Sequence, residues 1–136
     1  MNSRDDKPTI LIVDDDAGTL LAMDAVLQVL PVHIILESGA RTAIKRVLTE
    51  TISLIILDIS MPEIDGYEAT EQIRATDPGR AIPIILVTGM MVDINDQFKG
   101  YKSGAIDFLL KPVDSDVLKI KVCIALGIDP PLDESD

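Results

Sequence analysis

Short apolar runs alternate along the chain with stretches in which apolar residues recur every three or four positions. The runs consist mainly of isoleucine, leucine and valine, which is typical of strands buried on both faces. The predicted strands cover residues 9–13, 32–36, 53–57, 82–87 and 106–109. The predicted helices cover residues 17–30, 40–49, 67–75, 93–102 and 115–126. This alternation of strand and helix indicates an α/β domain with a parallel sheet.

The first predicted helix places four apolar residues on one face and is stopped by a proline. Leu20, Met23, Leu27 and Leu30 have the spacing of a single helical face, and Pro31 follows them. The last predicted helix is apolar on more than one side. Val117, Ile120 and Ile124 form one stripe, and Leu118, Val122 and Ala125 form another. We expect either a helix buried on both flanks or a second stripe, containing Val122, that meets a partner.

The length and the ends of the chain favour one domain with short extensions. The chain has 136 residues, 47% of them hydrophobic, which is enough for a core without disulfides. We expect an N-terminal extension over residues 1–8, one domain over residues 9–126, and an acidic tail or linker over residues 127–136.

Charge and cysteine content exclude several classes of function. The net charge of −11 argues against direct binding to nucleic acid, which needs a basic surface. One histidine and one cysteine cannot form the usual zinc site, and Cys123 is expected to be a buried thiol. No apolar stretch has the length of a membrane span, and the N-terminus lacks the apolar region of a secretory signal. We therefore expect no membrane partner and a cytoplasmic location.

Polar side chains follow four of the predicted strands directly. They are Asp14, Asp15 and Asp16 after the first strand, Asp58 after the third, Thr88 after the fourth and Lys111 after the fifth. Because the carboxyl ends of parallel strands meet at one edge of a sheet, these side chains are expected to share a site. Carboxylates, a hydroxyl and an amine in one place suit a divalent cation and a phosphoryl group.

The acids also have structural explanations. Asp16 is the best candidate for the N-cap of the first helix, and Asp58 alone could serve as a turn residue. A cap does not need three consecutive acids, however, and adjacent carboxylates repel unless a cation lies between them. This favours a metal role for Asp15 and Asp14. A carboxylate beside such a metal, here Asp58, can act as a nucleophile toward phosphorus.

These residues, taken in order, resemble the receiver domain of two-component response regulators. The matching features are Asp14-Asp15, Asp58 within residues 57–66, Thr88, and Lys111-Pro112, and the resemblance covers residues 8–126. It implies a flavodoxin-like, doubly wound five-stranded parallel sheet of order 2-1-3-4-5 with five helices. The segment over residues 100–114 is similar to receivers attached to multidomain sensor kinases. The chain is therefore expected to be either a single-domain regulator or part of a larger protein, in which case a hybrid histidine kinase is the expected class.

The resemblance also implies a role for each site residue. Asp58 is expected to accept a phosphoryl group from a histidine kinase or phosphotransfer protein. Asp14, Asp15, Asp58 and the backbone carbonyl of Ser60 would hold Mg²⁺, for which Mn²⁺ can substitute. Thr88 and Lys111 would bind the phosphoryl oxygens, and the domain would catalyse its own phosphorylation and dephosphorylation.

The same resemblance implies a conformational switch, and the second apolar stripe of the last helix allows an assembly. Thr88 and Phe108 occupy the switch positions, and the Lys111–Pro112 peptide bond is expected to be cis. The helix over residues 93–102 is the expected responder, because Gly100 weakens it. Gly89, where alanine is common, would leave more room above the site. A homodimer through the fourth and fifth helices is one arrangement that would pass the signal on.

Three other functions were weighed against this one. A phosphotransferase of the haloacid dehalogenase type needs a second acid two residues after its nucleophile, and Asp58-Ile-Ser60 lacks it. A flavodoxin-like electron carrier would have its FMN phosphate repelled by Asp14 and Asp15. A degenerate receiver, acting as an interaction module without phosphorylation, remains the main alternative, although the acid, threonine and lysine set is complete.

Overall fold

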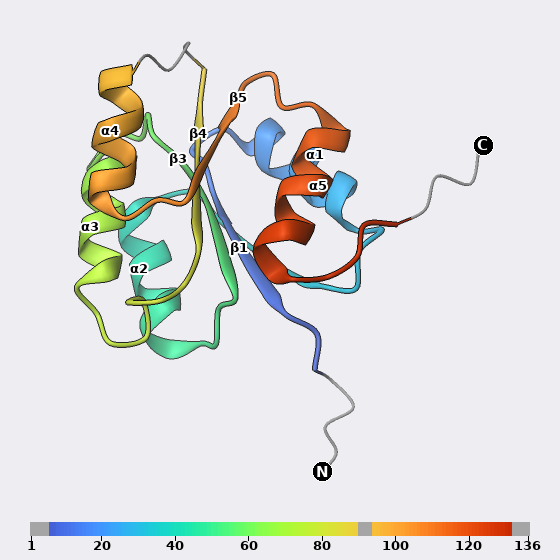
Figure 1. Cartoon of the computed structure of the whole chain (residues 1–136). Helices are drawn as coiled ribbons and strands as arrows, with labels where there is room; N and C mark the ends of the chain where they lie inside the picture. The colour runs from blue at the N-terminus through green and yellow to red at the C-terminus, as the bar shows by residue number, and fades with distance from the viewer. Residues whose placement is uncertain (1–5, 90–93, 132–136) are drawn as a thin grey trace.

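The computed structural model describes residues 6–89 and 94–131. Five parallel strands form one sheet between two layers of helices, as Figure 1 shows. The strands are β1 (Thr9–Val13), β2 (His33–Glu37), β3 (Leu54–Asp58), β4 (Ile84–Thr88) and β5 (Asp107–Leu110). The helices are α1 (Ala17–Leu27), α2 (Ala40–Thr49), α3 (Gly66–Arg74), α4 (Ile94–Ser103) and α5 (Ser115–Leu126). The strand order is β2-β1-β3-β4-β5, which confirms the predicted fold class.

The central strand β3 separates two apolar cores. Successive side chains of a strand point to opposite faces of the sheet. Ile55 and Leu57 therefore pack toward α2 and α3, and Leu54 and Ile56 pack toward α1 and α5. All four of these side chains are fully buried. Their burial explains why this segment reads as an unbroken apolar run.

The strand register brings the predicted site residues to one edge of the sheet. Val13 lies beside Leu57, so Asp14 and Asp58 follow neighbouring strands at the same level. Thr88 pairs with Leu110, which places Lys111 next to the end of β4. The backbone amide of Lys111 donates to the carbonyl of Thr88 at 2.8 Å and fixes this arrangement.

The ends of several elements differ from the sequence predictions. The helix expected over residues 17–30 ends at Leu27, because Pro31 disfavours helical backbone at Leu30 and a tighter turn from Leu30 to Leu27 follows the helix. The strand expected from Ile82 begins at Ile84; Pro83 precedes it and accepts a bond from Ile55. β2, β3 and β5 each begin one residue later than predicted. Asp93, the expected first residue of the fourth helix, lies outside the described residues.

The two stripes of α5 have the opposite orientation to the one expected. Leu118 and Val122 are buried in the core shared with α1. Val117, Ile120 and Ile124 are 42%, 49% and 75% exposed. The expectation that the stripe containing Val122 meets a partner is therefore wrong. The outer stripe is the one available for contacts.

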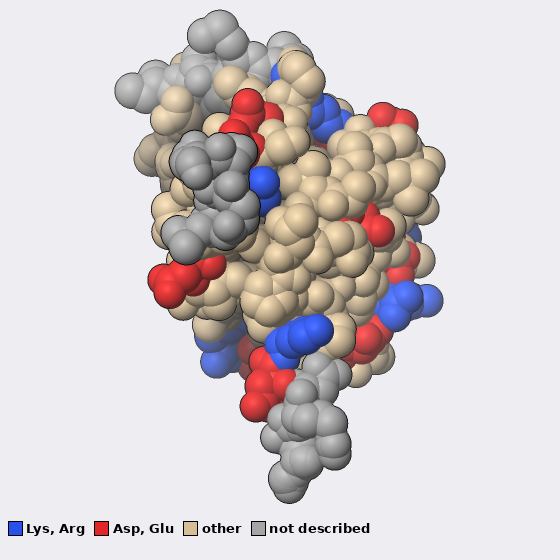
Figure 2. All heavy atoms as spheres, turned by 90° about the vertical axis from the view of Figure 1, so that its right-hand side faces the viewer, with Lys and Arg blue, Asp and Glu red and all other residues tan. Residues whose placement is uncertain are grey.

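The molecular face formed by α1 and α5 carries few charges. Figure 2 shows this face, with uncharged side chains over most of its centre and charged ones mainly toward its margins. α1 contributes Leu21, which is 63% exposed, and Val29 just beyond the helix is 62% exposed.

Among the helices in residues 6–89 and 94–131, none combines the length and the apolar character that crossing a membrane requires.

Candidate phosphoryl and metal site

Three carboxylates meet at the carboxyl edge of the sheet. One oxygen from each of Asp14, Asp15 and Asp58 lies within 4.8 Å of the other two. Asp14 and Asp58 are 1% and 3% exposed, whereas Asp15 is open to solvent. The cluster thus has a buried floor and an accessible side. The sequence prediction that these acids share one site is confirmed in its geometry.

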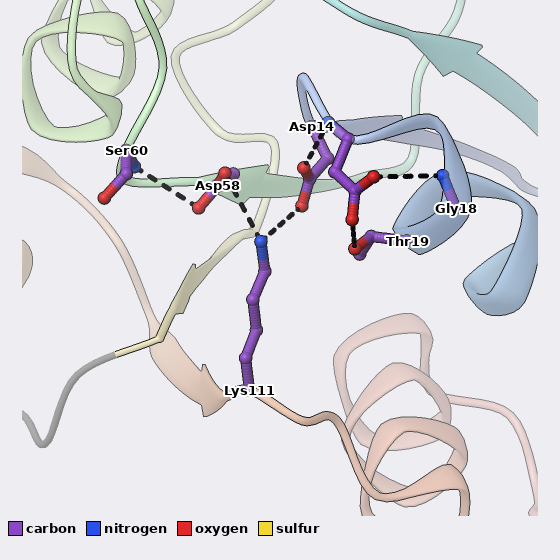
Figure 3. A network of polar contacts seen from close by, with 7 residues as sticks. Asp14, Gly18, Thr19, Asp58, Ser60 and Lys111 are labelled. Atoms are coloured by element: carbon purple, nitrogen blue, oxygen red, sulfur yellow. Dashed lines mark hydrogen bonds and ion pairs between the residues drawn. The ribbon is translucent and has the colours of Figure 1, made fainter.

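Lys111 joins the two buried carboxylates, as Figure 3 shows. Its Nζ lies 3.0 Å from Oδ2 of Asp14 and 3.5 Å from Oδ2 of Asp58. Burial alone would lower the pKa of Lys111, but the hydrogen bond to Asp14 and the negative charges of Asp58 and Asp14 raise it above its ordinary value. Lys111 is therefore a permanent cation at the site.

The Asp58 carboxylate is held in an environment that disfavours its charge. Burial raises its pKa above the ordinary value, and the nearby charge of Asp14 raises it further. The backbone amide of Ser60, which donates to Oδ1 of Asp58 at 3.2 Å, and the ammonium of Lys111 act in the opposite direction. An additional cation at this place would relieve the repulsion between Asp58 and Asp14.

Asp16 caps α1, as its sequence position predicts. Its carboxylate accepts from the amide of Gly18 at 3.2 Å and from the hydroxyl of Thr19 at 2.7 Å (Figure 3). The bond from Thr19, followed by that from Gly18, holds the pKa of Asp16 below its ordinary value. The amide of Asp16 donates to Oδ1 of Asp14 at 2.9 Å. The cap therefore also orients the first buried acid of the site.

A close approach behind Asp58 explains why Gly66 begins α3. A Cβ at position 66 would lie 2.7 Å from Cα of Ile59 and 2.8 Å from the carbonyl oxygen of Asp58. The amide of Gly66 instead donates to the carbonyl of Ile59 at 2.8 Å. Asp65 caps the same helix through the amide of Glu68. This turn holds the loop after β3 against the strand that presents Asp58.

The predicted switch residues lie on neighbouring strands. Thr88 is buried at the end of β4, and Phe108 is half-buried on β5, opposite Leu86. The Lys111–Pro112 bond is cis, as predicted. Gly89 is exposed, and a Cβ there would meet no atom within 4 Å among the described residues, so an alanine would also fit. The extra space expected from Gly89 thus lies at a position that is already open to solvent.

A pocket of about 370 Å³ opens beside the site, between α1 and α5. Met23, Val26 and Leu118 contribute its apolar lining, and Asp16, Thr19 and Lys111 contribute polar atoms. Sequence reasoning did not find this pocket. The ion pair between Lys111 and Asp14 was also not predicted from the sequence.

The donor set fits a magnesium ion. Mg²⁺ is a hard cation that prefers oxygen ligands and is commonly held by one or two carboxylates and several waters. Two buried carboxylates and an exposed one, close together and repelling each other, match that preference.

Comparison with known proteins assigns the chain to a family. The sequence profile described as "Response regulator receiver domain" matches residues 10–123. The chain therefore belongs to the family of response regulator receiver domains, which act as phosphoacceptors in two-component systems, bind Mg²⁺ through an aspartate cluster and interact with histidine kinases or phosphotransfer proteins.

Curated relatives are longer proteins. Over 118 residues the chain is 32% identical to the transcriptional regulatory protein ZraR of Klebsiella oxytoca, covering 87% of this chain and 26% of ZraR. Over 109 residues it is 32% identical to the sensor protein GacS of Pseudomonas syringae pv. syringae, covering 78% of this chain and 12% of GacS. The chain thus spans about a quarter or less of these relatives' length.

Solved structures show the same fold. A putative response regulator from Chloroflexus aurantiacus J-10-fl superposes with a TM-score of 0.83 at 27% identity, covering 89% of this chain and 98% of the other. The receiver domain of sensor histidine kinase PA1611 from Pseudomonas aeruginosa PAO1 has a TM-score of 0.80 at 28% identity, with the same coverage. That structure is described as having a magnesium ion coordinated in the active site cleft.

Proposed function

We propose that this domain accepts a phosphoryl group on Asp58 from a histidine kinase or phosphotransfer protein and changes conformation in response. The observation that carries the assignment is the position of Asp58. It is buried at the end of the central strand, next to Asp14 and within 3.5 Å of Lys111. Asp58 ends the central strand β3, whereas Asp14 and Asp15 follow β1 and would remain as metal ligands.

The transfer step uses groups already in place. An oxygen of Asp58 forms a bond to phosphorus while the bond from phosphorus to the donor nitrogen breaks, and the nitrogen keeps the electron pair. The ammonium of Lys111 and the hydroxyl of Thr88 neutralise and orient the equatorial phosphoryl oxygens. The domain thereby takes an active part in its own phosphorylation and, by attack of water on the acyl phosphate, in its dephosphorylation.

Asp14, Asp15, Asp58 and the carbonyl of Ser60 hold the metal in this proposal. Mg²⁺, or Mn²⁺ in its place, supplies positive charge to the phosphoryl oxygens and offsets the repulsion among the acids. The magnesium described in the PA1611 receiver supports this assignment by analogy. The fit of the oxygen donors supports it independently.

A small phosphodonor tests the assignment directly. Wild type and Asp58→Asn should be incubated with acetyl phosphate and Mg²⁺ and compared by intact-mass spectrometry. We expect one phosphoryl adduct on wild type and none on Asp58→Asn, because the amide is a poor nucleophile. Lys111→Ala should still bind Mg²⁺ but lose most of the adduct. Equal adducts on wild type and Asp58→Asn would refute the assignment and leave the phosphorylation-independent interaction module as the better explanation.

The free edge of the sheet is the proposed homodimer surface. Exposed apolar residues lie on the three consecutive elements around that edge: Phe98 and Tyr101 on α4, Ile106 and Leu110 at β5, and Val117, Ile120 and Ile124 on α5. β5 ends the strand order, so among the described residues no strand pairs with its outer side. Contiguous apolar residues at such an edge are typical of an interface.

The remaining parts of the proposal concern the chain around the domain. Residues 9–126 form the receiver domain, preceded by a short extension and followed by an acidic tail or linker. The phosphoryl donor reaches Asp58 at the edge beside the charge-poor face over α1 and α5. We place the domain in the cytoplasm, within a response regulator or a hybrid sensor kinase.

A further inference from the structure

Gly100 occupies a buried position in the interior of α4, where glycine weakens a helix relative to alanine. A Cβ built there would collide with Cζ of Phe108 and lie 3.1 Å and 3.2 Å from Cε2 and Cε1. The tip of the Phe108 ring therefore lies where a methyl group would be. An alanine at this position would require the ring of Phe108 to move away.

The backbone on both sides of this contact is fixed. Ser103 and Ala105 both donate to the carbonyl of Gly100, at 2.6 Å and 3.1 Å. Arg74 donates from Nε and Nη2 to the carbonyl of Gly104, at 3.2 Å and 2.7 Å, and so ties the end of α4 to α3. Because the backbone of α4 is held in this way, a side chain added at position 100 would displace the Phe108 ring more easily than it would displace the helix.

The backbone of Phe108 is also held in place. Nζ of Lys121 on α5 donates to the carbonyl of Phe108 at 2.9 Å and pairs with Asp107 at 2.8 Å. The ring itself makes an edge-to-face contact with Tyr101, with centroids 5.5 Å apart and planes at 87°. A change of side-chain rotamer is thus the movement open to Phe108, and it would break the contacts with Gly100 and Tyr101 together.

We propose that Gly100 is a positioning residue for the switch: it holds the Phe108 ring in the unphosphorylated conformation, and the ring leaves Gly100 when Asp58 is phosphorylated. This rests on the proposed function. Phe108 lies three residues before Lys111 on the strand that pairs with Thr88, so ring position and site geometry share one short segment of backbone. Gly100→Ala removes the space for the ring and should shift the population toward the phosphorylated conformation.

The test uses beryllofluoride with Mg²⁺ as the phosphoryl mimic and calorimetry as the measurement. We expect Gly100→Ala to bind the mimic at least about fivefold more tightly than wild type. Asn95→Ala, an exposed change in the same helix, controls for helix propensity and should leave the affinity unchanged. In a Phe108→Leu background, Gly100→Ala should lose its effect, because the shorter side chain does not reach position 100.

Fluorine NMR observes the ring directly and does not depend on the stability of the variant. The chain has two phenylalanines, and the exposed Phe98 serves as an internal reference for Phe108. In wild type the mimic should shift the Phe108 resonance, and unliganded Gly100→Ala should shift it in the same direction. Wild type that fails to bind the mimic would contradict the proposed function. Binding with an unmoved Phe108 resonance, or with unchanged or weaker affinity in Gly100→Ala, would overturn the role of Gly100 alone.

Discussion

At the scale of single residues, Asp58, the proposed phosphoryl acceptor, lies where its negative charge is unfavourable. It is buried, it faces the charge of Asp14, and its pKa is raised. For an acid, a raised pKa in the folded state means that the fold is penalised when the group ionises. The penalty is absent below the ordinary pKa, develops as the pH rises through the folded pKa, and is fully present above it. The ionised carboxylate at the proposed phosphorylation position therefore lowers the stability of the metal-free fold.

Removing this charge should stabilise the metal-free domain. In EDTA at pH 7 we expect Asp58→Asn to raise the free energy of unfolding by about 1 kcal/mol, measured by urea denaturation. The gain should vanish below about pH 4, where the wild-type carboxyl is protonated in the unfolded chain as well. Mg²⁺ or Mn²⁺ should raise the melting temperature of wild type more than that of the variant.

Asp6→Asn provides the control for this prediction. It removes one exposed negative charge from the segment that precedes β1, at the opposite end of that strand from the site. It should change stability little at any pH, because an exposed charge is well solvated. An Asp58→Asn protein that is less stable than wild type in EDTA at pH 7 would contradict the explanation from charge repulsion.

A candidate site residue could be predicted from the sequence when its position at the end of a strand was enough to place it. Asp58, Thr88 and Lys111 each follow an apolar run, and a parallel sheet brings such ends together. The ion pair between Lys111 and Asp14 could not be predicted in this way, because it depends on the path of the lysine side chain. The contact between Gly100 and Phe108 also required the packing of α4 on β5.

At the scale of elements, strands and helices were predictable in number and order but less so in their ends. A run of apolar residues locates a strand, whereas its hydrogen-bonded limits depend on its neighbours. α5 illustrates the same limit for orientation. Its two apolar stripes are similar in composition, so the sequence alone did not distinguish core from surface, and only the packing against α1 did.

Two substitutions on α5 should separate its faces. Leu118→Ala, at a position only 1% exposed, should lower the free energy of unfolding by about 2–5 kcal/mol because it leaves a cavity. Ile124→Ala, at a position 75% exposed, should change it by no more than about 0.5 kcal/mol. Urea denaturation measures both. Comparable losses for the two variants would mean that the outer stripe is also covered in solution.

At the scale of the whole molecule, the sheet divides the domain into two layers with different surroundings. α2, α3 and α4 cover one face, α1 and α5 cover the other, and β5 forms the free edge between them (Figure 1). A second copy placed at that edge would contact both layers at once. Phe108, the predicted switch residue, lies on β5, and the outer stripe of α5 follows it in the chain.

Sedimentation velocity should detect the proposed dimer. We expect wild type to show a larger dimer fraction with beryllofluoride and Mg²⁺ than without them. Ile120→Lys places a charge in the outer stripe of α5 and should remain monomeric. Leu21→Lys, on the exposed side of α1, is the matched control and should behave as wild type. A wild type that stays monomeric throughout, or equal effects of the two lysines, would exclude this interface.

The ion pair of Lys111 has a consequence for the valence of the ion that the site selects. Three carboxylates and one ammonium leave two negative charges, so a divalent ion balances the site and a sodium or potassium ion does not. The proposed phosphorylation would replace one charge on Asp58 with about two and so strengthen the hold on a divalent ion. By thermodynamic linkage, the ion favours the phosphorylated form to the same extent. In the proposed function, the free magnesium concentration would then influence how much of the domain is phosphorylated.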